Sequence, residues 1–343
     1  MKALVLAAHN TFVLREVPDP VPGPGEVLVA VRACGICGSD VHGMDGSTGR
    51  RRPPIVMGHE AAGVVAAAGP GVTGWSPGDR VTFDSTVSCG ACWHCRRGEI
   101  NLCDNRRVLG VSCEEYRRDG AFADLVAVPA AILYRLPDGL AFEHAAMVEA
   151  VSIAVHAVRR AAMPLGASVA VVGAGMIGQL VIQAARRSGC GRLVAVDPDP
   201  ARRELARRLG ADDALDPAAG DIPARVGERT EGRGADFVFE VVGAPDPFRT
   251  AVEAARKGGV VTLVGNLAPR VELPLQAAVT RELSLLGSCA SSGEYPACIE
   301  MLARGWIDVR PLLSAVAPLA EGPAWFDRLR RREPGLMKVV LRP

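Results

Sequence analysis

The sequence lacks the features of a membrane protein or of a nucleic-acid-binding protein. No apolar run approaches the roughly 18 residues that a membrane span needs. The 39 basic residues stand against 38 acidic ones, and aromatic residues make up only 4%. A nucleic-acid or membrane-surface protein would carry a strong cationic excess, so we expect neither partner. The start, MKALVLAAHNTF, has no long apolar segment or cleavage pattern, which predicts a cytoplasmic protein without a secretory signal.

The 343 residues are 49% hydrophobic, which allows a substantial core, and the length predicts about two domains. The pattern changes near residue 143, from short strands broken by Gly and Pro to strands that alternate with helices. The strands expected in the first part are 27–34, 61–69 and 79–83. Those expected afterwards are 167–173, 192–197, 236–242, 259–265 and 283–288, with helices at 143–163, 176–189 and 201–210. This alternation predicts an α/β fold, a parallel sheet covered by helices on both faces.

A GxGxxG turn connects one of these strands to a helix. Gly173 would permit a tight turn, Gly175 would let a pyrophosphate approach the backbone, and Gly178 would let helix and strand pack closely. Asp197 ends the next strand, 19 residues beyond Gly178, where its carboxylate would bind ribose hydroxyls and repel a 2′-phosphate. NAD is therefore favoured over NADP, with Arg202 as a nearby cation. The alternative is a glycine-rich turn without a ligand. The residues predicted to bind the cofactor are Gly173, Gly175, Met176, Ile177, Gly178, Asp197 and Arg202.

Four cysteines lie within residues 89–103 in the pattern Cys-x2-Cys-x2-Cys-x7-Cys, and they are Cys89, Cys92, Cys95 and Cys103. In a reducing compartment such a cluster predicts metal ligands, and four thiolates complete the shell of a structural zinc ion. An iron–sulfur cluster is disfavoured because Asp104, not Pro, follows the last cysteine. A zinc ribbon that binds nucleic acid is disfavoured by the net charge, and the nearby arginines are interpreted as a solvated face.

A second, open metal site is predicted from separate segments. Cys37 follows the strand 27–34, and His59 and Glu60 lie together in the β-rich part. Such ligands suit a catalytic zinc ion that keeps one position open. Glu149 lies among apolar residues, where a carboxylate is costly unless it is paired or bound to a metal. Taken singly, each residue has an ordinary structural explanation, but their occurrence beside a nicotinamide-binding pattern favours the metal site.

Five features occur in an order and spacing that are very specific when combined. They are CGICGSDVH (34–42), GHEAAG (58–63), the four cysteines, GAGMIG (173–178) and Asp197. Over essentially its whole length the chain resembles the zinc-dependent medium-chain dehydrogenase/reductase family. It is most similar to the polyol branch, which holds sorbitol and galactitol-phosphate dehydrogenases and, further away, threonine 3-dehydrogenase. The resemblance implies a discontinuous GroES-like catalytic domain (1–152 and 288–343) and a Rossmann NAD-binding domain (153–287).

The resemblance also implies roles for individual residues. It makes Cys37, His59 and Glu60 catalytic zinc ligands, and Glu149 the acid that holds or replaces the zinc-bound water. Asp40 would orient a zinc ligand. Ser39 and His42 would pass the proton of a small-molecule alcohol substrate to water. Hydride would pass from the alcohol to NAD and leave a ketone. A homo-oligomer, either tetramer or dimer, is expected from the same resemblance.

Some positions depart from the polyol branch. Sorbitol dehydrogenases carry an Arg-Tyr pair where this chain has Ala290 and Ser291, so sorbitol itself is in doubt. The arginine run Arg50–Arg52 is interpreted as a solvated loop, with a phosphate or carboxylate of the substrate as its alternative ligand. A threonine dehydrogenase and a polyol-phosphate dehydrogenase stay open as alternatives. A zinc-free quinone-type reductase and an NAD-binding zinc protein without turnover are disfavoured, because neither needs an open zinc site.

Overall fold

The computed structural model describes residues 1–113 and 116–343, which form two compact units. The β unit comprises Met1–Glu149, Tyr295–Gly305 and Val309–Pro343. The α/β unit comprises Ala150–Glu294 and Trp306–Asp308. None of the described helices is long and apolar enough to cross a bilayer.

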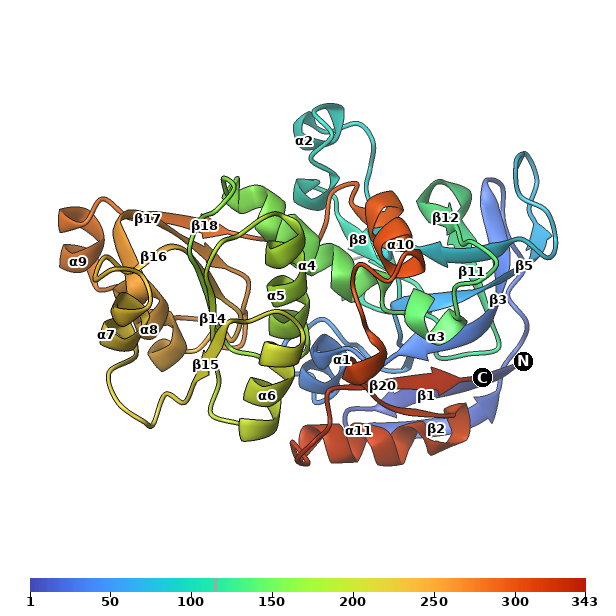
Figure 1. Cartoon of the computed structure of the whole chain (residues 1–343). Coiled ribbons are helices and arrows are strands. Elements are labelled where there is room, and N and C mark those ends of the chain that lie inside the picture. Colours follow the sequence, from blue (N-terminus) through green and yellow to red (C-terminus); the bar gives the residue numbers. More distant parts are fainter. Residues whose placement is uncertain (114–115) are drawn as a thin grey trace. The chain divides into compact units, whose positions relative to one another are not determined.

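The β unit is built on a seven-stranded sheet and a three-stranded sheet (Figure 1). The larger sheet has the order β12 (Leu133–Arg135), β6 (Arg80–Phe83), β5 (Glu60–Ala68), β3 (Glu26–Gly35), β20 (Lys338–Arg342) and β19 (Leu313–Pro318), with β11 (Leu125–Pro129) also on β3. The smaller sheet has the order β2 (Thr11–Glu16), β1 (Lys2–Ala8) and β4 (Ile55–Val56). Two short pairs are β7 (Thr86–Val87) with β8 (Arg107–Val108), and β9 (Ser112–Cys113) with β10 (Tyr116–Arg117). The helices are α1 (Gly38–Gly43), α2 (Trp93–Arg96), α3 (Phe142–Ala145), α10 (Tyr295–Ala303) and α11 (Gly322–Arg330), with 3₁₀ turns at Ile100–Leu102, Ala130–Ile132, Arg310–Leu312 and Leu319–Glu321.

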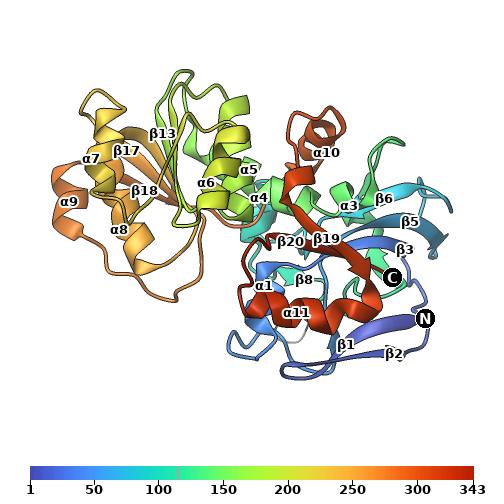
Figure 2. The ribbon, with the colours of Figure 1, turned by 60° about the horizontal axis from the view of Figure 1, so that its bottom comes forward.

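The core of the β unit follows from strand periodicity. Val27, Val29 and Val31 alternate along β3 and are all buried, as expected of a strand with one face in the core. Helix α11 closes this core with Phe326, whose ring lies 4.3 Å from that of Phe12 and 5.7 Å from that of Phe122 (centroid distances). Figure 2 shows α11 running alongside β1 and β2.

Three strand ends meet at one place in the larger sheet. At the end of β3, Gly35 is paired with Glu60, the first residue of β5. Gly35 is also paired with Val340, two residues after the start of β20. Residues close to positions 35, 60 and 338 are therefore neighbours in space although they are far apart in the sequence.

The α/β unit is a parallel six-stranded sheet. Its order is β15 (Asp213–Leu215), β14 (Leu193–Val196), β13 (Val169–Val172), β16 (Ala235–Glu240), β17 (Ala255–Leu263) and β18 (Ser284–Gly287). Its helices are α5 (Met176–Arg187), α6 (Pro200–Arg208), α7 (Ile222–Glu228), α8 (Pro245–Ala254) and α9 (Leu275–Thr280), and α4 (Val148–Ala161) begins at the unit boundary. Figures 1 and 2 show α5 and α6 on one face of the sheet and α7 and α8 on the other. The strand order is that of a doubly wound Rossmann sheet, which confirms the predicted fold class.

Candidate active site

The GxGxxG turn has the backbone geometry that its glycines predict. Gly173 directly follows β13 and has a φ of +98°, a region that residues other than glycine rarely adopt. A Cβ on Gly178 would collide with the carbonyl oxygen of Gly173, so only glycine allows α5 to start this close to the strand. Gly175 is the N-cap residue of α5 and has an extended backbone. Because glycine has no side chain, no side-chain hydrogen bond caps the first turn of the helix. Met176 and Ile177 follow as the first helical residues, so the N–H groups of the first turn stay available to an anion.

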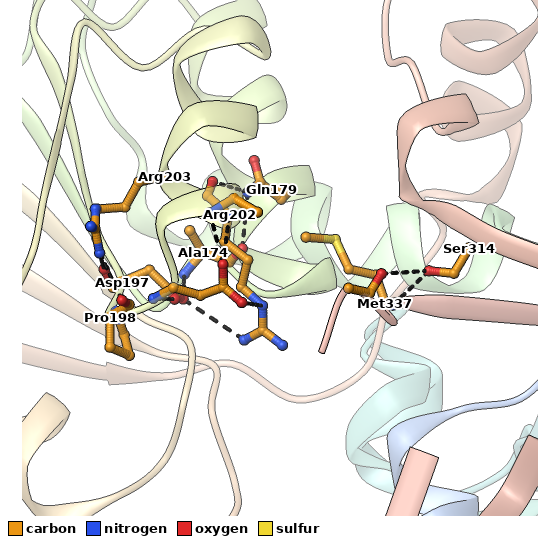
Figure 3. A network of polar contacts seen from close by, with 11 residues as sticks. Ala174, Gln179, Asp197, Pro198, Arg202, Arg203, Ser314 and Met337 are labelled. Carbon is orange, nitrogen blue, oxygen red and sulfur yellow. Dashed lines mark hydrogen bonds and ion pairs between the residues drawn. The ribbon is translucent and has the colours of Figure 1, made fainter. Parts of the chain in front are cut away.

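Asp197 lies directly after β14 and is held beside this turn (Figure 3). Its Oδ2 accepts the N–H of Ala174 at 2.8 Å, and its Oδ1 accepts the N–H of Asp199 at 2.9 Å. Gln179 donates to the carbonyl oxygens of Ala174 and Arg202, both at 2.9 Å, which fixes the turn against the start of α6. The Arg202 Nη1 lies 4.0 Å from Asp197 Oδ2, so an anion and a cation stand together at this edge.

The four-cysteine group is assembled by local backbone structure. The four Sγ atoms lie within 4.8 Å of one another. The N–H of Cys89 faces Cys103 Sγ at 3.2 Å, and that of Cys92 faces Cys89 Sγ at 3.4 Å. Hydrogen bonds from the backbone N–H groups of Ala91 and Cys92 lower the pKa of Cys89 to about 6. Since a thiolate is the form that binds metal, this set of donors fits a closed, four-coordinate zinc ion.

The Cys37–His59–Glu60 group forms where the three strand ends meet. Its Cys Sγ, His nitrogen and carboxylate oxygen lie within 4.8 Å of one another. Cys37 caps α1, and His59 and Glu60 stand at the start of β5. A Cβ on Gly35 would collide with Glu60 Oε2, so a glycine is needed opposite the carboxylate. The donor set is one that zinc accepts in catalytic sites, with three protein ligands and one position left.

A buried carboxylate lies behind His59. Asp40 is fully buried, and its Oδ1 lies 3.4 Å from His59 Nδ1 and 2.8 Å from Arg51 Nη2. Its Oδ2 accepts the N–H of Cys37 at 3.3 Å. Burial opposes the ionised form, but the charges of His59 and Arg51 outweigh it and hold the pKa of Asp40 well below its usual range. Asp40 and Cys37 in turn raise the pKa of His59 well above its ordinary value, against the effect of burial.

Lys338 is a buried cation that contacts the Glu60 carboxylate of the group. Its Nζ contacts Glu60 Oε2 at 2.5 Å and the carbonyl oxygen of Ile36 at 3.0 Å, and both side chains are buried. Met337, just before it, donates its N–H to Ser314 Oγ at 2.8 Å, which fixes the start of β20 (Figure 3). Glu60 Oε1 is buried and has no hydrogen-bond partner among the residues described. One carboxylate oxygen is thus neutralised by Lys338, and the other stays available to a metal ion.

The remaining predicted residues take separate positions. Glu149, the second residue of α4, is not part of the Cys37–His59–Glu60 group. Its Oε2 is shielded from solvent, and this burial together with the charge of Glu60 raises the pKa of Glu149 to about 7. Ser39 and His42 lie on α1 and are exposed.

Comparisons with known proteins give the family. Residues 23–138 match the alcohol dehydrogenase GroES-like domain, and residues 177–304 match the zinc-binding dehydrogenase domain. Sorbitol dehydrogenase of Bacillus subtilis (strain 168) is 32% identical over 350 residues, which cover 100% of this chain and 97% of that protein. The chain belongs to the zinc-binding alcohol dehydrogenase family. L-Idonate 5-dehydrogenase of Vitis vinifera is 36% identical over 302 residues, covering 86% of this chain and 81% of that protein. Among solved structures, a protein of Sinorhizobium meliloti 1021 described as a zinc-binding dehydrogenase, with NADP bound, has a TM-score of 0.91 and 34% identity, covering 100% of this chain and 99% of that one.

This zinc-binding dehydrogenase therefore uses zinc and a nicotinamide cofactor, as the sequence predicts. The roles of single residues and the choice of NAD stay predictions. Sequence reasoning missed Lys338, and its interpretation of the arginine run as solvated is wrong for Arg51, which is buried and paired with Asp40. The available signal for Lys338 was a lone cation at the start of the apolar segment 338–341. Nothing in the sequence distinguishes Arg51 from its exposed neighbours Arg50 and Arg52.

Proposed function

We propose that this dehydrogenase oxidises a secondary alcohol of a polyol or sugar derivative to the ketone, with NAD as the hydride acceptor. The observation that carries the proposal is the Cys37–His59–Glu60 group, whose Glu60 Oε1 is left without a protein partner among the described residues. A closed structural site would have no use for three mixed ligands and an open position. The names of the relatives support the substrate class, since sorbitol and L-idonate are both polyhydroxy compounds.

The residues in and around the Cys37–His59–Glu60 group would have different roles. Cys37, His59 and Glu60 would hold the zinc ion, which when bound lowers the pKa of a substrate hydroxyl. Asp40 Oδ1 lies 3.4 Å from His59 Nδ1 and would accept a hydrogen bond from it, which would leave Nε2 for the metal. Lys338 offsets the negative charge of Glu60 and limits it to one free oxygen.

Two solvent-exposed side chains are suited to transfer the proton of the substrate hydroxyl to water. Ser39 and His42 are both exposed on α1, one helical turn apart, so they suit carriers that pass the hydroxyl proton outward. Glu149 has a pKa near neutrality, raised by burial and by Glu60, and suits a group that takes up and releases a proton in the same pH range.

Two departures limit the substrate. Ala290 stands in a left-handed conformation with φ of 51° and has no polar side chain, and Ser291 is buried. Neither offers the charged and phenolic groups that the Arg-Tyr pair of sorbitol dehydrogenases supplies. The proposal therefore names the polyol class and does not commit to sorbitol.

NADH formation tests the function directly. We expect turnover on one class within a panel of free polyols, their phosphates, inositols, sugar acids, threonine and simple diols. Since the zinc ion supplies the activation of the hydroxyl, a zinc chelator should abolish that turnover and added zinc should restore it. Turnover that survives loss of all bound zinc would contradict the zinc mechanism. Turnover on threonine alone would overturn the polyol assignment.

The cofactor choice has its own test. The Asp197 carboxylate would repel the 2′-phosphate of NADP, and two backbone hydrogen bonds hold it in place. We expect Asp197→Asn to lower the ratio of kcat/KM for NAD to that for NADP by about tenfold or more, a change of about 1.4 kcal/mol. Arg202→Gln is the matched control and should shift the ratio in the opposite direction or leave it unchanged. An unchanged ratio in Asp197→Asn would contradict the assignment.

A further inference from the structure

We propose that Arg51 is a positioning residue for the predicted zinc ligand His59, and that it acts through Asp40. The inference rests on the proposed function, because it takes the Cys37–His59–Glu60 group to be a zinc site. It gives a role in that site to a residue that lies outside the ligand set and inside a run of three arginines.

Burial separates Arg51 from its two neighbours. Arg51 is 4% exposed, whereas Arg50 and Arg52 are both exposed. Its Nη2 lies 2.8 Å from Oδ1 of Asp40, which is fully buried. A buried guanidinium and a buried carboxylate at this distance form a charge-assisted hydrogen bond in a low-dielectric setting.

Asp40 connects this pair to the metal ligands. The oxygen that faces Arg51 also lies 3.4 Å from His59 Nδ1, a contact at ion-pair distance, and among the described residues Nδ1 has no hydrogen-bond partner. The other oxygen accepts the backbone N–H of Cys37. Asp40 therefore contacts the ring of one predicted ligand, His59, and the backbone of another, Cys37. A histidine that binds metal through one nitrogen is oriented by the hydrogen bond at the other nitrogen, and such outer partners strengthen metal binding.

The cation is needed because the carboxylate is buried. An ionised carboxylate removed from water is costly unless a charge or hydrogen-bond donors compensate it. Without Arg51, the Asp40 carboxylate would lose its closest charged partner and turn toward other donors. His59 would then lose the carboxylate oxygen that faces its Nδ1. The contact with Arg51 thus holds Asp40 in the position that faces the ring.

The chain also fixes Arg51 itself. Its side-chain stem passes so close to Gly43 that a Cβ there would lie 2.9 Å from Arg51 Cγ. The backbone on both sides of Arg51 is hydrogen-bonded to Ser112. The Ser112 N–H donates to the Arg50 carbonyl oxygen at 2.9 Å, and Ser112 Oγ accepts from the Arg52 N–H at 3.3 Å. The loop therefore presents Arg51 inward and leaves its neighbours in water.

The test measures zinc retention in the full-length protein, with Arg51→Met as the variant and Arg52→Met as the matched control. Zinc content is followed under graded chelator, so that zinc of the four-cysteine group serves as an internal reference in the same molecule. We expect Arg51→Met to weaken zinc binding at the Cys37–His59–Glu60 group by about tenfold, with the internal reference unchanged. Arg52→Met should retain zinc at both sites, and Arg51→Lys, which keeps the charge, should recover most of the loss.

A double-mutant cycle separates positioning from general structural damage. Asp40→Asn should also weaken zinc binding by about tenfold. If Arg51 acts through Asp40, the combination of Arg51→Met with Asp40→Asn is no weaker than Asp40→Asn alone. An independent structural role would instead multiply the two effects to about a hundredfold. Multiplied effects, or unchanged or tighter zinc binding in Arg51→Met, would overturn the inference.

The wild-type protein distinguishes this failure from that of the proposed function. Zinc bound only by the four-cysteine group in the wild type would refute the catalytic zinc site and the inference together. Zinc in both groups of the wild type, with Arg51→Met matching Arg52→Met, would refute the role of Arg51 alone.

Discussion

The two candidate metal-ligand groups of this chain both bring their donor atoms together but are built in opposite ways. In each group the atoms lie within 4.8 Å of one another. The four-cysteine group comes from the 15 consecutive residues 89–103, and backbone N–H groups of the same segment contact its sulfur atoms. The Cys37–His59–Glu60 group joins the ends of different strands and is surrounded by buried charges. Local sequence suffices for the first group, whereas the second requires the whole β unit to be folded.

This difference in how the two groups are built indicates which kind of zinc site each group suits. Four thiolates fill the tetrahedron of a zinc ion, so the four-cysteine group can stabilise its own segment and do little else. Three mixed ligands leave a position open, and they need charges that tune them. Asp40 and Lys338 supply these charges to different ligands, Asp40 beside His59 and Lys338 against Glu60. The open group therefore depends on residues that a ligand pattern does not contain.

The largest expected effect falls on the open group. Cys37→Ser should lower kcat by about a thousandfold or more, equivalent to about 4 kcal/mol, because the metal that activates the hydroxyl loses a ligand. Zinc in the four-cysteine group should remain, since its ligands share no element with Cys37. Steady-state kinetics and zinc analysis on the same preparation check this. The exposed Cys289, outside both groups, gives the control variant Cys289→Ser, which should keep full activity. Substantial turnover in Cys37→Ser would remove Cys37 from the ligand set.

The sequence predicts the features built from neighbouring residues more completely than those assembled from distant segments. The GxGxxG turn, Asp197 and the four cysteines are spaced by rules of local geometry, and the structure places each set together. Cys37, His59 and Glu60 were predicted as an open metal site from their residue types beside a nicotinamide-binding pattern, and the resemblance then assigned their roles, because spacing alone does not bring positions 37 and 59 together. Lys338 is 278 residues from Glu60, and only the pairing of β20 with β3 brings it there. Arg51 was missed because burial inside a polar run has no period to reveal it.

An intermediate effect is expected from Lys338→Met. The change leaves Glu60 buried without its cation, which should lower the free energy of unfolding of the metal-free protein by about 3 kcal/mol. Turnover should fall by about tenfold, because Glu60 is no longer limited to one free oxygen. Chemical denaturation with and without zinc measures the first effect, and kcat measures the second. Lys338→Arg keeps the charge and should stay close to wild type in both. Equal free energies of unfolding for Lys338→Met and wild type in the absence of metal would show that the Lys338–Glu60 pair does not stabilise the fold.

The smallest effect on turnover is expected from the four-cysteine group. Cys92→Ser removes one thiolate ligand, whereas the serine hydroxyl can still cap α2, where Cys92 Sγ faces the N–H of Cys95 at 3.5 Å. The segment 89–103 should lose its zinc and become more sensitive to limited proteolysis, because the short helix α2 and the His94–Glu99 contact would then order it without the metal cross-link. The kcat of the folded fraction should stay within about twofold of wild type, since the local site supplies no group to the reaction. A loss of turnover comparable to that of Cys37→Ser, with the core intact, would mean that the two groups are coupled. The separation between a local structural site and an assembled reactive one would then be wrong.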